Sequence, residues 1–155
     1  MIIWLGEMLV LAIHARQIAE HGGDAALRDE GLLESAMARP QQLLAYGEPP
    51  PDIADLAAAL TYGLARNHPF VDGNKRTAAV CCETFIELNG AVLEADDVAL
   101  FPQYLALAAG TLAERTFAEW LRPRLQLARR NEAHQPRPAY KTKTKRVAKK
   151  VARAP

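Results

Sequence analysis

Apolar residues recur at helical spacing along most of the first 128 residues of the chain. A spacing of three to four residues indicates helices with one buried face, and no pair of segments alternates as two neighbouring strands would. The pattern therefore predicts a compact, all-α single domain. The expected helices span 3–20, 30–39, 53–67, 74–88, 97–109 and 117–128.

Residues that start or stop helices set these expected boundaries. Asp29 and Asp52 are good N-caps, because a short polar side chain can accept hydrogen bonds from the first-turn amides. Gly22-Gly23 and Asn89-Gly90 supply residues that tolerate positive φ at the end of a helix. Proline lacks a backbone donor and restricts the residue before it, so Pro40 is expected to stop the second helix.

Two further signals concern the last two helices. Pro102 falls within the first turns of its helix and is expected only to kink it. Thr116-Phe117-Ala118-Glu119 has the form of a capping box, in which the threonine and glutamate side chains satisfy the first amides. The sequence therefore predicts that the last helix begins at Phe117.

The net charge of +1 conceals two parts of opposite sign. Residues 1–128 contain nine Lys or Arg and seventeen Asp or Glu, which gives −8, whereas residues 129–155 contain ten Lys or Arg and one acid, which gives +9. The second part also lacks most large apolar residues. We therefore predict a folded domain over 1–128 and a disordered basic tail over 129–155.

Composition excludes several classes of protein. There is no apolar run of 18 residues, so we expect no membrane-spanning helix. The N-terminus lacks a basic segment followed by a cleavage site. Cys81 and Cys82 are adjacent within a helical pattern, which indicates thiols in or near the core of a cytoplasmic protein rather than a disulfide.

One run of nine residues combines the groups that a phosphate-handling site needs. His68-Pro69-Phe70-Val71-Asp72-Gly73-Asn74-Lys75-Arg76 joins the end of one expected helix to the start of the next. A helix N-terminus offers unpaired amides to an anion, and a glycine permits the turn that exposes them. Cations in a first turn oppose the helix dipole, so Lys75 and Arg76 indicate an anionic ligand nearby.

The other polar residues of the run suggest chemistry at that ligand. Asp72 offers the hard oxygen that Mg²⁺ prefers, and His68 can accept a proton from an attacking hydroxyl near neutral pH. Asn74 can donate to a phosphate oxygen or fix the loop. Each residue alone is ordinary, since Asp-Gly-Asn is usually only a turn. Their combination points to phosphoryl or nucleotidyl transfer.

The run resembles the signature of the Fic/Doc superfamily, H-P-F-x-D/E-G-N-G/K-R, and is most similar to its death-on-curing (Doc) branch. Lys75 stands where Fic adenylyltransferases generally have a second glycine, and Ala79 stands where they have a second arginine. Residues 22–40 also look like the N-terminal half of Doc-type proteins. The resemblance covers roughly residues 3–125 and implies a helical bundle of the Fic/Doc type.

The resemblance also implies a role for each residue of the motif. His68 would be the general base on a target hydroxyl, and Asp72 would hold Mg²⁺. Arg28 and its neighbours would form a flap that docks the target or the nucleotide. The residues that would bind the phosphates of ATP are Gly73, Asn74, Lys75 and Arg76.

The family makes two products, and the sequence leaves both open. Fic enzymes usually transfer AMP, whereas Doc-like members can transfer the γ-phosphoryl group of ATP as protein kinases. Lys75 would fill part of the anion hollow used for AMP transfer, which favours phosphoryl transfer. The resemblance implies a bacterial toxin of a type II toxin–antitoxin system that acts on the translation machinery. No Ser or Thr is followed four residues later by Glu, the self-inhibitory pattern of Fic proteins, so inhibition would come from a Phd-type antitoxin.

The basic tail supports an alternative of another class. A segment with a charge of +9 can contact nucleic-acid phosphates without sequence preference. The chain would then be a nucleic-acid-binding or regulatory module with an inactive site. A soluble, disordered extension without such a role is the simpler interpretation of the same residues.

Overall fold

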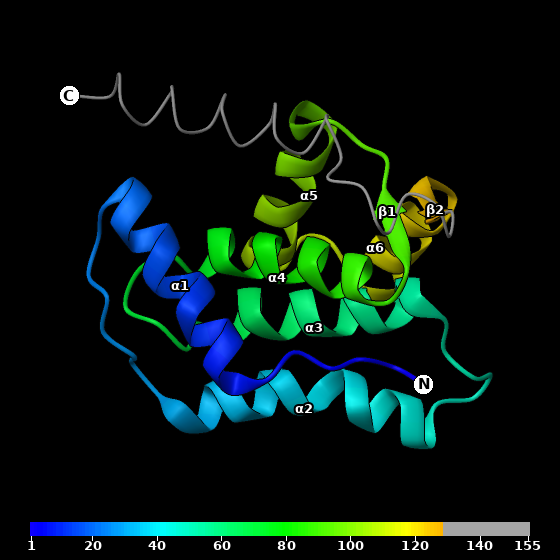
Figure 1. Ribbon diagram of the computed structural model, residues 1–155, viewed down its shortest axis with the longest axis horizontal. Helices are drawn as coiled ribbons and strands as arrows, with labels where there is room; N and C mark the ends of the chain where they lie inside the picture. The colour runs from blue at the N-terminus through cyan, green and yellow to red at the C-terminus, as the bar shows by residue number, and fades with distance from the viewer. Residues whose placement is uncertain (129–155) are drawn as a thin grey trace.

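The structure is a computed structural model and describes residues 1–128 (Figure 1), so the tail predicted over 129–155 lies outside the described residues. The described part is mainly helical, which confirms the predicted all-α fold. Its helices are α1 (Glu7–His21), α2 (Glu30–Tyr46), α3 (Ile53–Asn67), α4 (Asn74–Leu88), α5 (Asp97–Ala109) and α6 (Glu114–Leu121). No helix in this part is both long and apolar enough to span a bilayer.

The antiparallel neighbours α3 and α4 form the centre of the molecule (Figure 1). The most buried helix is α3, because α2, α4, α5 and α6 all pack on it, while α1 crosses α4. Cys81 and Cys82 lie on α4 and are fully buried, as the sequence predicted for core thiols. Loss of solvation raises the pKa of each thiol to about 12, so both stay protonated at neutral pH.

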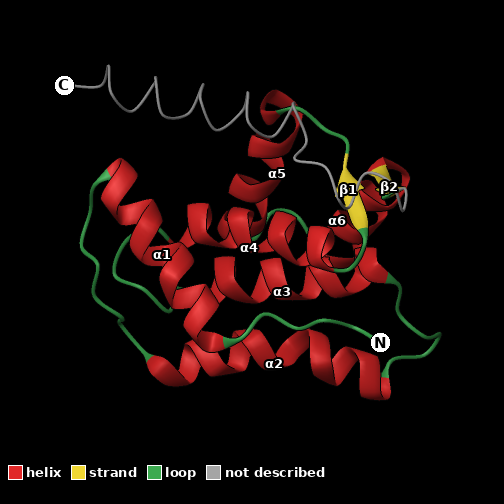
Figure 2. Ribbon diagram, viewed as in Figure 1, coloured by secondary structure: helices red, strands yellow, loops and turns green. Residues whose placement is uncertain are grey.

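The helical domain also carries one pair of strands that the sequence analysis did not predict. Two short strands, β1 (Ala91–Leu93) and β2 (Leu125–Leu127), pair antiparallel at one edge of the molecule (Figure 2). Strands of three residues are too short to show alternation, and the pairing joins segments far apart in the sequence. The 3-10 turn Arg122–Arg124 precedes β2, so α6 ends at Leu121 rather than continuing to Ala128.

Three helix boundaries also differ from those predicted. The second helix does not stop at Pro40 but continues to Tyr46, because Pro40 lies on the same buried face as Leu33 and Ala36, packed against α3. Burial of this face outweighs the roughly 3 kcal/mol that an internal proline costs. By contrast α5 continues through Pro102 as expected.

The other two boundary errors occur at helix starts. The last helix begins at Glu114, ahead of the apparent capping box, since burial of Phe117 and Leu121 sets its register. The first helix begins at Glu7 because Ile3 is paired elsewhere: its amide and carbonyl bond the side chain of Asn89, at 2.8 and 2.9 Å.

An ion pair at the start of α3 gives an acid-dependent contribution to stability. Asp52 caps this helix and accepts a hydrogen bond of 2.6 Å from Nε of Arg122. That bond is the main reason why the pKa of Asp52 falls from 3.8 to about 2. A carboxyl whose pKa is lower in the folded protein stabilises the fold above pH 3.8, and this contribution is lost as the pH falls toward 2.

We therefore expect Asp52→Asn, which still caps α3, to weaken the loss of stability between pH 4 and pH 2. The change should be small because the pair is partly exposed to solvent. Urea unfolding at a series of pH values measures it. Asp96→Asn is the matched control, because Asp96 caps α5 without an arginine partner in the described region. An acid dependence identical in all three proteins would contradict this assignment.

Candidate active site

The backbone at the end of α3 places His68 at the start of the motif loop. His68 has φ 50°, the only positive φ of a non-glycine residue within residues 1–128. Such a left-handed conformation usually costs an L-residue about 1–2 kcal/mol, and strained residues cluster at functional sites. The imidazole is exposed and has no hydrogen-bond partner in the described part of the chain. It is therefore available to an incoming group.

The loop that follows is held from inside by Asn74. The amide of Phe70 donates to Oδ1 of Asn74 at 2.9 Å, and Nδ2 of Asn74 donates to the Phe70 carbonyl at 2.8 Å. Both residues are buried. Of the two roles that the sequence left open for Asn74, fixing the loop is the one these contacts display, and the phosphate role is a prediction that they leave untested.

The start of α4 presents unpaired donors. Gly73 precedes the helix with φ 79°, and no side chain caps the first turn. The amides of Asn74, Lys75 and Arg76 donate to no other group within residues 1–128. Neither Lys75 nor Arg76 forms an ion pair there, although this part of the chain carries a net charge of −8. Free amides and cations together make a site for an anion.

The carboxylate of Asp72 lies beside this anion site. Its Oδ2 accepts a hydrogen bond of 2.8 Å from the amide of Asp24, which fixes the side chain at the edge of the loop. A carboxylate has a second oxygen, and Mg²⁺ in nucleotide sites typically takes one or two carboxylates and fills its other positions with waters and phosphates. The exposed Asp72 fits that requirement. A cation held there would lie next to the anion site at the start of α4.

His14 of α1 is a supporting residue that the sequence did not reveal. It is buried, its Nε2 donates to the Asp72 carbonyl at 2.8 Å, and its ring stacks on Phe70 with centroids 3.7 Å apart. It thus fixes the backbone between the carboxylate and Gly73. A histidine on the apolar face of an expected helix is a signal in the sequence for a buried polar contact. The sequence does not say which loop that histidine contacts.

Arg28 supports the same loop from another direction. Its side chain donates to the carbonyls of His68 and Asn67, at 2.7 and 2.9 Å, and its amide donates to the Pro69 carbonyl. The adjacent Leu27 pairs with Phe70 in an isolated antiparallel bridge. The segment predicted to be a flap therefore lies against the motif loop, and in this structure Arg28 braces the backbone of His68.

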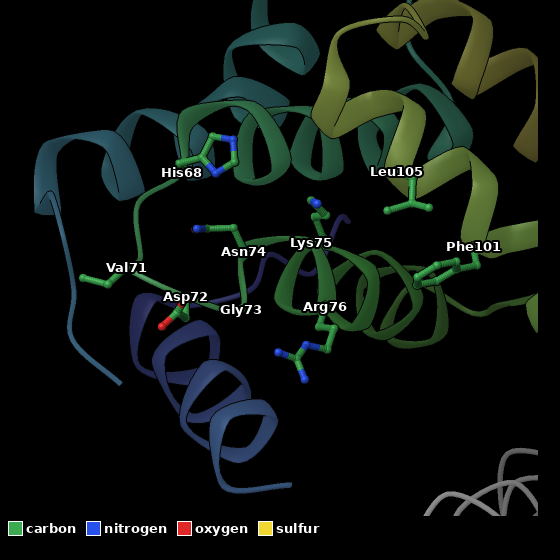
Figure 3. Close-up of a pocket in the computed structure, with 9 residues that line it drawn as sticks. All are labelled: His68, Val71, Asp72, Gly73, Asn74, Lys75, Arg76, Phe101 and Leu105. Atoms are coloured by element: carbon green, nitrogen blue, oxygen red, sulfur yellow. The ribbon is translucent and has the colours of Figure 1, made fainter. Parts of the chain in front are cut away.

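The motif residues open onto one pocket of about 410 Å³, shown in Figure 3. The motif forms one side of it, and α5 contributes two apolar residues, Phe101 and Leu105, that the sequence analysis did not single out. The pocket is lined by His68, Val71, Asp72, Gly73, Asn74, Lys75, Arg76, Phe101 and Leu105. All the predicted motif residues of the site are thus brought together, while Arg28 contacts the pocket only through His68.

Comparison with known proteins places the chain among its relatives. Residues 4–86 match the model of the Fic/DOC family. The chain is 51% identical over 75 residues to "Toxin Doc" of Mycolicibacterium smegmatis, which covers 48% of this chain and 58% of that protein. It is 32% identical over 113 residues to "Protein kinase doc" of Escherichia phage P1, which covers 73% of this chain and 88% of the phage protein. The motif, the helical fold and these matches together show that the chain belongs to the Fic/DOC family.

Proposed function

We propose that this chain is a Doc-type toxin that transfers the γ-phosphoryl group of ATP to a hydroxyl of a target protein. The observation that carries the proposal is the convergence of an unpaired imidazole, an exposed carboxylate and an unpaired cationic helix start on one pocket. Relatives named as a toxin and as a protein kinase support it.

Each part of the pocket has a role in this reaction. Lys75, Arg76 and the first amides of α4 bind the phosphate oxygens, and Asp72 would hold Mg²⁺, which supplies positive charge beside them. His68 accepts the proton as the target oxygen bonds to the γ-phosphorus. The bond from that phosphorus to the bridging oxygen breaks, and ADP leaves with the electron pair.

The same proposal extends to the setting of the protein. A toxin that phosphorylates proteins needs a neutralising partner, for which we propose a Phd-type antitoxin, and we place its target in the translation machinery of the bacterial cytoplasm. The toxin name of the mycobacterial relative supports the antitoxin partner. The basic residues 129–155, for which nucleic-acid attachment was the alternative, lie outside the described residues.

Labelling from two positions of ATP tests the reaction. The full chain is incubated with Mg²⁺, a bacterial lysate and ATP labelled in either the α- or the γ-phosphate. We expect a protein band labelled from the γ position only, present with wild type and with His21→Asn, and absent with His68→Asn. His21 is an exposed histidine at the end of α1, outside the pocket, and so is the matched control.

Two other outcomes would redirect the assignment. A His68-dependent band labelled from the α position would identify AMP transfer in spite of Lys75. No His68-dependent label from either position would overturn the proposal, and binding of nucleic acid by the full chain would then be the function to measure.

A further inference from the structure

The C-terminal half of α1 lies against the part of the motif loop that carries the exposed carboxylate. Figure 3 shows Asp72 and Gly73 directly beside this helix, which is drawn in blue. A Cβ added to Gly73 would lie 3.1 Å from Cδ1 of Ile18 and 3.6 Å from Nε2 of His14. Both of these α1 residues are buried. The loop is therefore packed on the helix at the residue next to the carboxylate.

Asp72 is held at both its backbone and its side chain from this side. Nε2 of His14 donates to the Asp72 carbonyl at 2.8 Å. The amide of Asp24, shortly after the end of α1, donates to Oδ2 of Asp72 at 2.8 Å. Within residues 1–128 the other oxygen, Oδ1, accepts no hydrogen bond. The side chain thus offers one unpaired oxygen in a fixed direction.

Gly23 is the residue that permits this close approach. Its φ is 119°, and a Cβ added there would lie 3.1 Å from Cβ of Asp72. Two carbons pack best at about 3.5–4.0 Å, so a side chain at position 23 would displace the Asp72 side chain. The neighbouring Gly22 also has a positive φ, 83°, but an added Cβ there would meet no atom within 4 Å. Both glycines adopt a conformation that L-residues avoid, and of the two it is Gly23 that contacts Asp72.

We propose that the C-terminal half of α1 orients the Asp72 carboxylate for Mg²⁺, with His14 and Gly23 as positioning residues. This inference deepens the proposed function and rests on it, because it takes Asp72 to hold the ion. Mg²⁺ demands near-ideal octahedral geometry at short distances, so a carboxylate turned from its direction binds the ion less well. Loss of the groups that orient a metal ligand typically weakens metal binding about 10–100-fold.

Titration calorimetry of the full chain with ATP, in Mg²⁺ and in EDTA, tests the inference. The ratio of the two affinities measures what the metal adds, and Asp72→Asn identifies the part of this gain that passes through Asp72. We expect Gly23→Ala to lower the gain about tenfold and to leave the affinity in EDTA unchanged. Gly22→Ala is the matched control, because it strains the same turn without contacting Asp72, and it should retain the gain.

The hydrogen bond from His14 is tested by two further substitutions. His14→Leu removes the donor to the Asp72 carbonyl and should also lower the gain from Mg²⁺. His14→Gln can place an amide nitrogen near the position of Nε2 and should restore the gain, whereas a loss of ring packing alone would affect both variants alike. A thermal melt shows which variants fold. If His14→Leu does not fold, the comparison of Gly23→Ala with Gly22→Ala decides.

The outcomes separate this inference from the proposed function. A wild-type gain from Mg²⁺ in both Gly23→Ala and His14→Leu would overturn the positioning role and leave the proposed function standing. An equal loss in Gly22→Ala and Gly23→Ala would assign the effect to backbone strain and would also overturn that role. A wild-type protein in which Mg²⁺ adds nothing through Asp72 would overturn the metal site on which both the inference and the proposed function rest.

Discussion

Replacing His68 with asparagine is expected to lower the rate of phosphoryl transfer by about 10²–10⁴-fold without unfolding the protein, because general base catalysis contributes a factor of that size. The imidazole is exposed and bonds to nothing in residues 1–128, so its removal leaves no buried group unpaired. Single-turnover labelling with γ-labelled ATP measures the rate, and a thermal melt measures the stability.

The choice of asparagine separates chemistry from backbone strain. With φ at 50°, most replacements would add the cost of a left-handed residue, whereas asparagine adopts this conformation more readily than other non-glycine residues. An alanine variant mixes the two effects and should melt at a lower temperature than the asparagine variant. A rate for His68→Asn close to that of wild type would show that another group accepts the proton.

The residues of the motif were predictable because they are neighbours in the sequence. A helix end, a glycine turn and a helix start place His68, Asp72 and Gly73 around one loop through local geometry alone. The central helix α3 was also predicted with the correct bounds, and α4 with a start at Gly73 or Asn74 and the correct end, because each carries an N-terminal signal and a continuous apolar face. Local signals are sufficient where both the element and its ends are encoded nearby.

What escaped prediction depends on contacts between distant segments. His14 contacts the motif loop only after α1 crosses α4, and Phe101 faces the pocket only after α5 packs on α3 and α4. Pro40 remains helical because its face is buried by α3. In each case tertiary packing outweighs or adds to a local preference, and periodicity does not identify the partner surface.

The same contacts explain how a loop can serve as a rigid site. The backbone of the motif loop accepts hydrogen bonds from His14 of α1 and from Arg28 of the segment between α1 and α2, and it is also bonded by Asn74 of α4. None of these three bonds uses the side chain of His68 or the second oxygen of Asp72. The loop is thereby fixed while its reactive groups remain available, which is the arrangement that preorganised catalysis requires.

Replacing Asn74 with alanine is expected to cost about 2–6 kcal/mol of folding free energy, because it leaves the buried amide and carbonyl of Phe70 without partners, at about 1–3 kcal/mol each. Domains of this size are stable by only about 5–15 kcal/mol, so the loss should be evident in urea unfolding. Transfer activity should fall together with stability, since the Phe70 backbone that loses its partners lies between His68 and Asp72.

The control for this variant lies at the other end of the same helix. Asn89 bonds both the amide and the carbonyl of Ile3 at a site open to water. Its Nδ2 also donates to the Phe85 carbonyl, which the backbone amide of Asn89 bonds as well. Water can replace the amide there, so Asn89→Ala should cost much less and leave transfer unchanged. The comparison also decides the role of Asn74. If Asn74→Ala kept its unfolding free energy but bound ATP more weakly, the amide would serve the phosphates and not the loop.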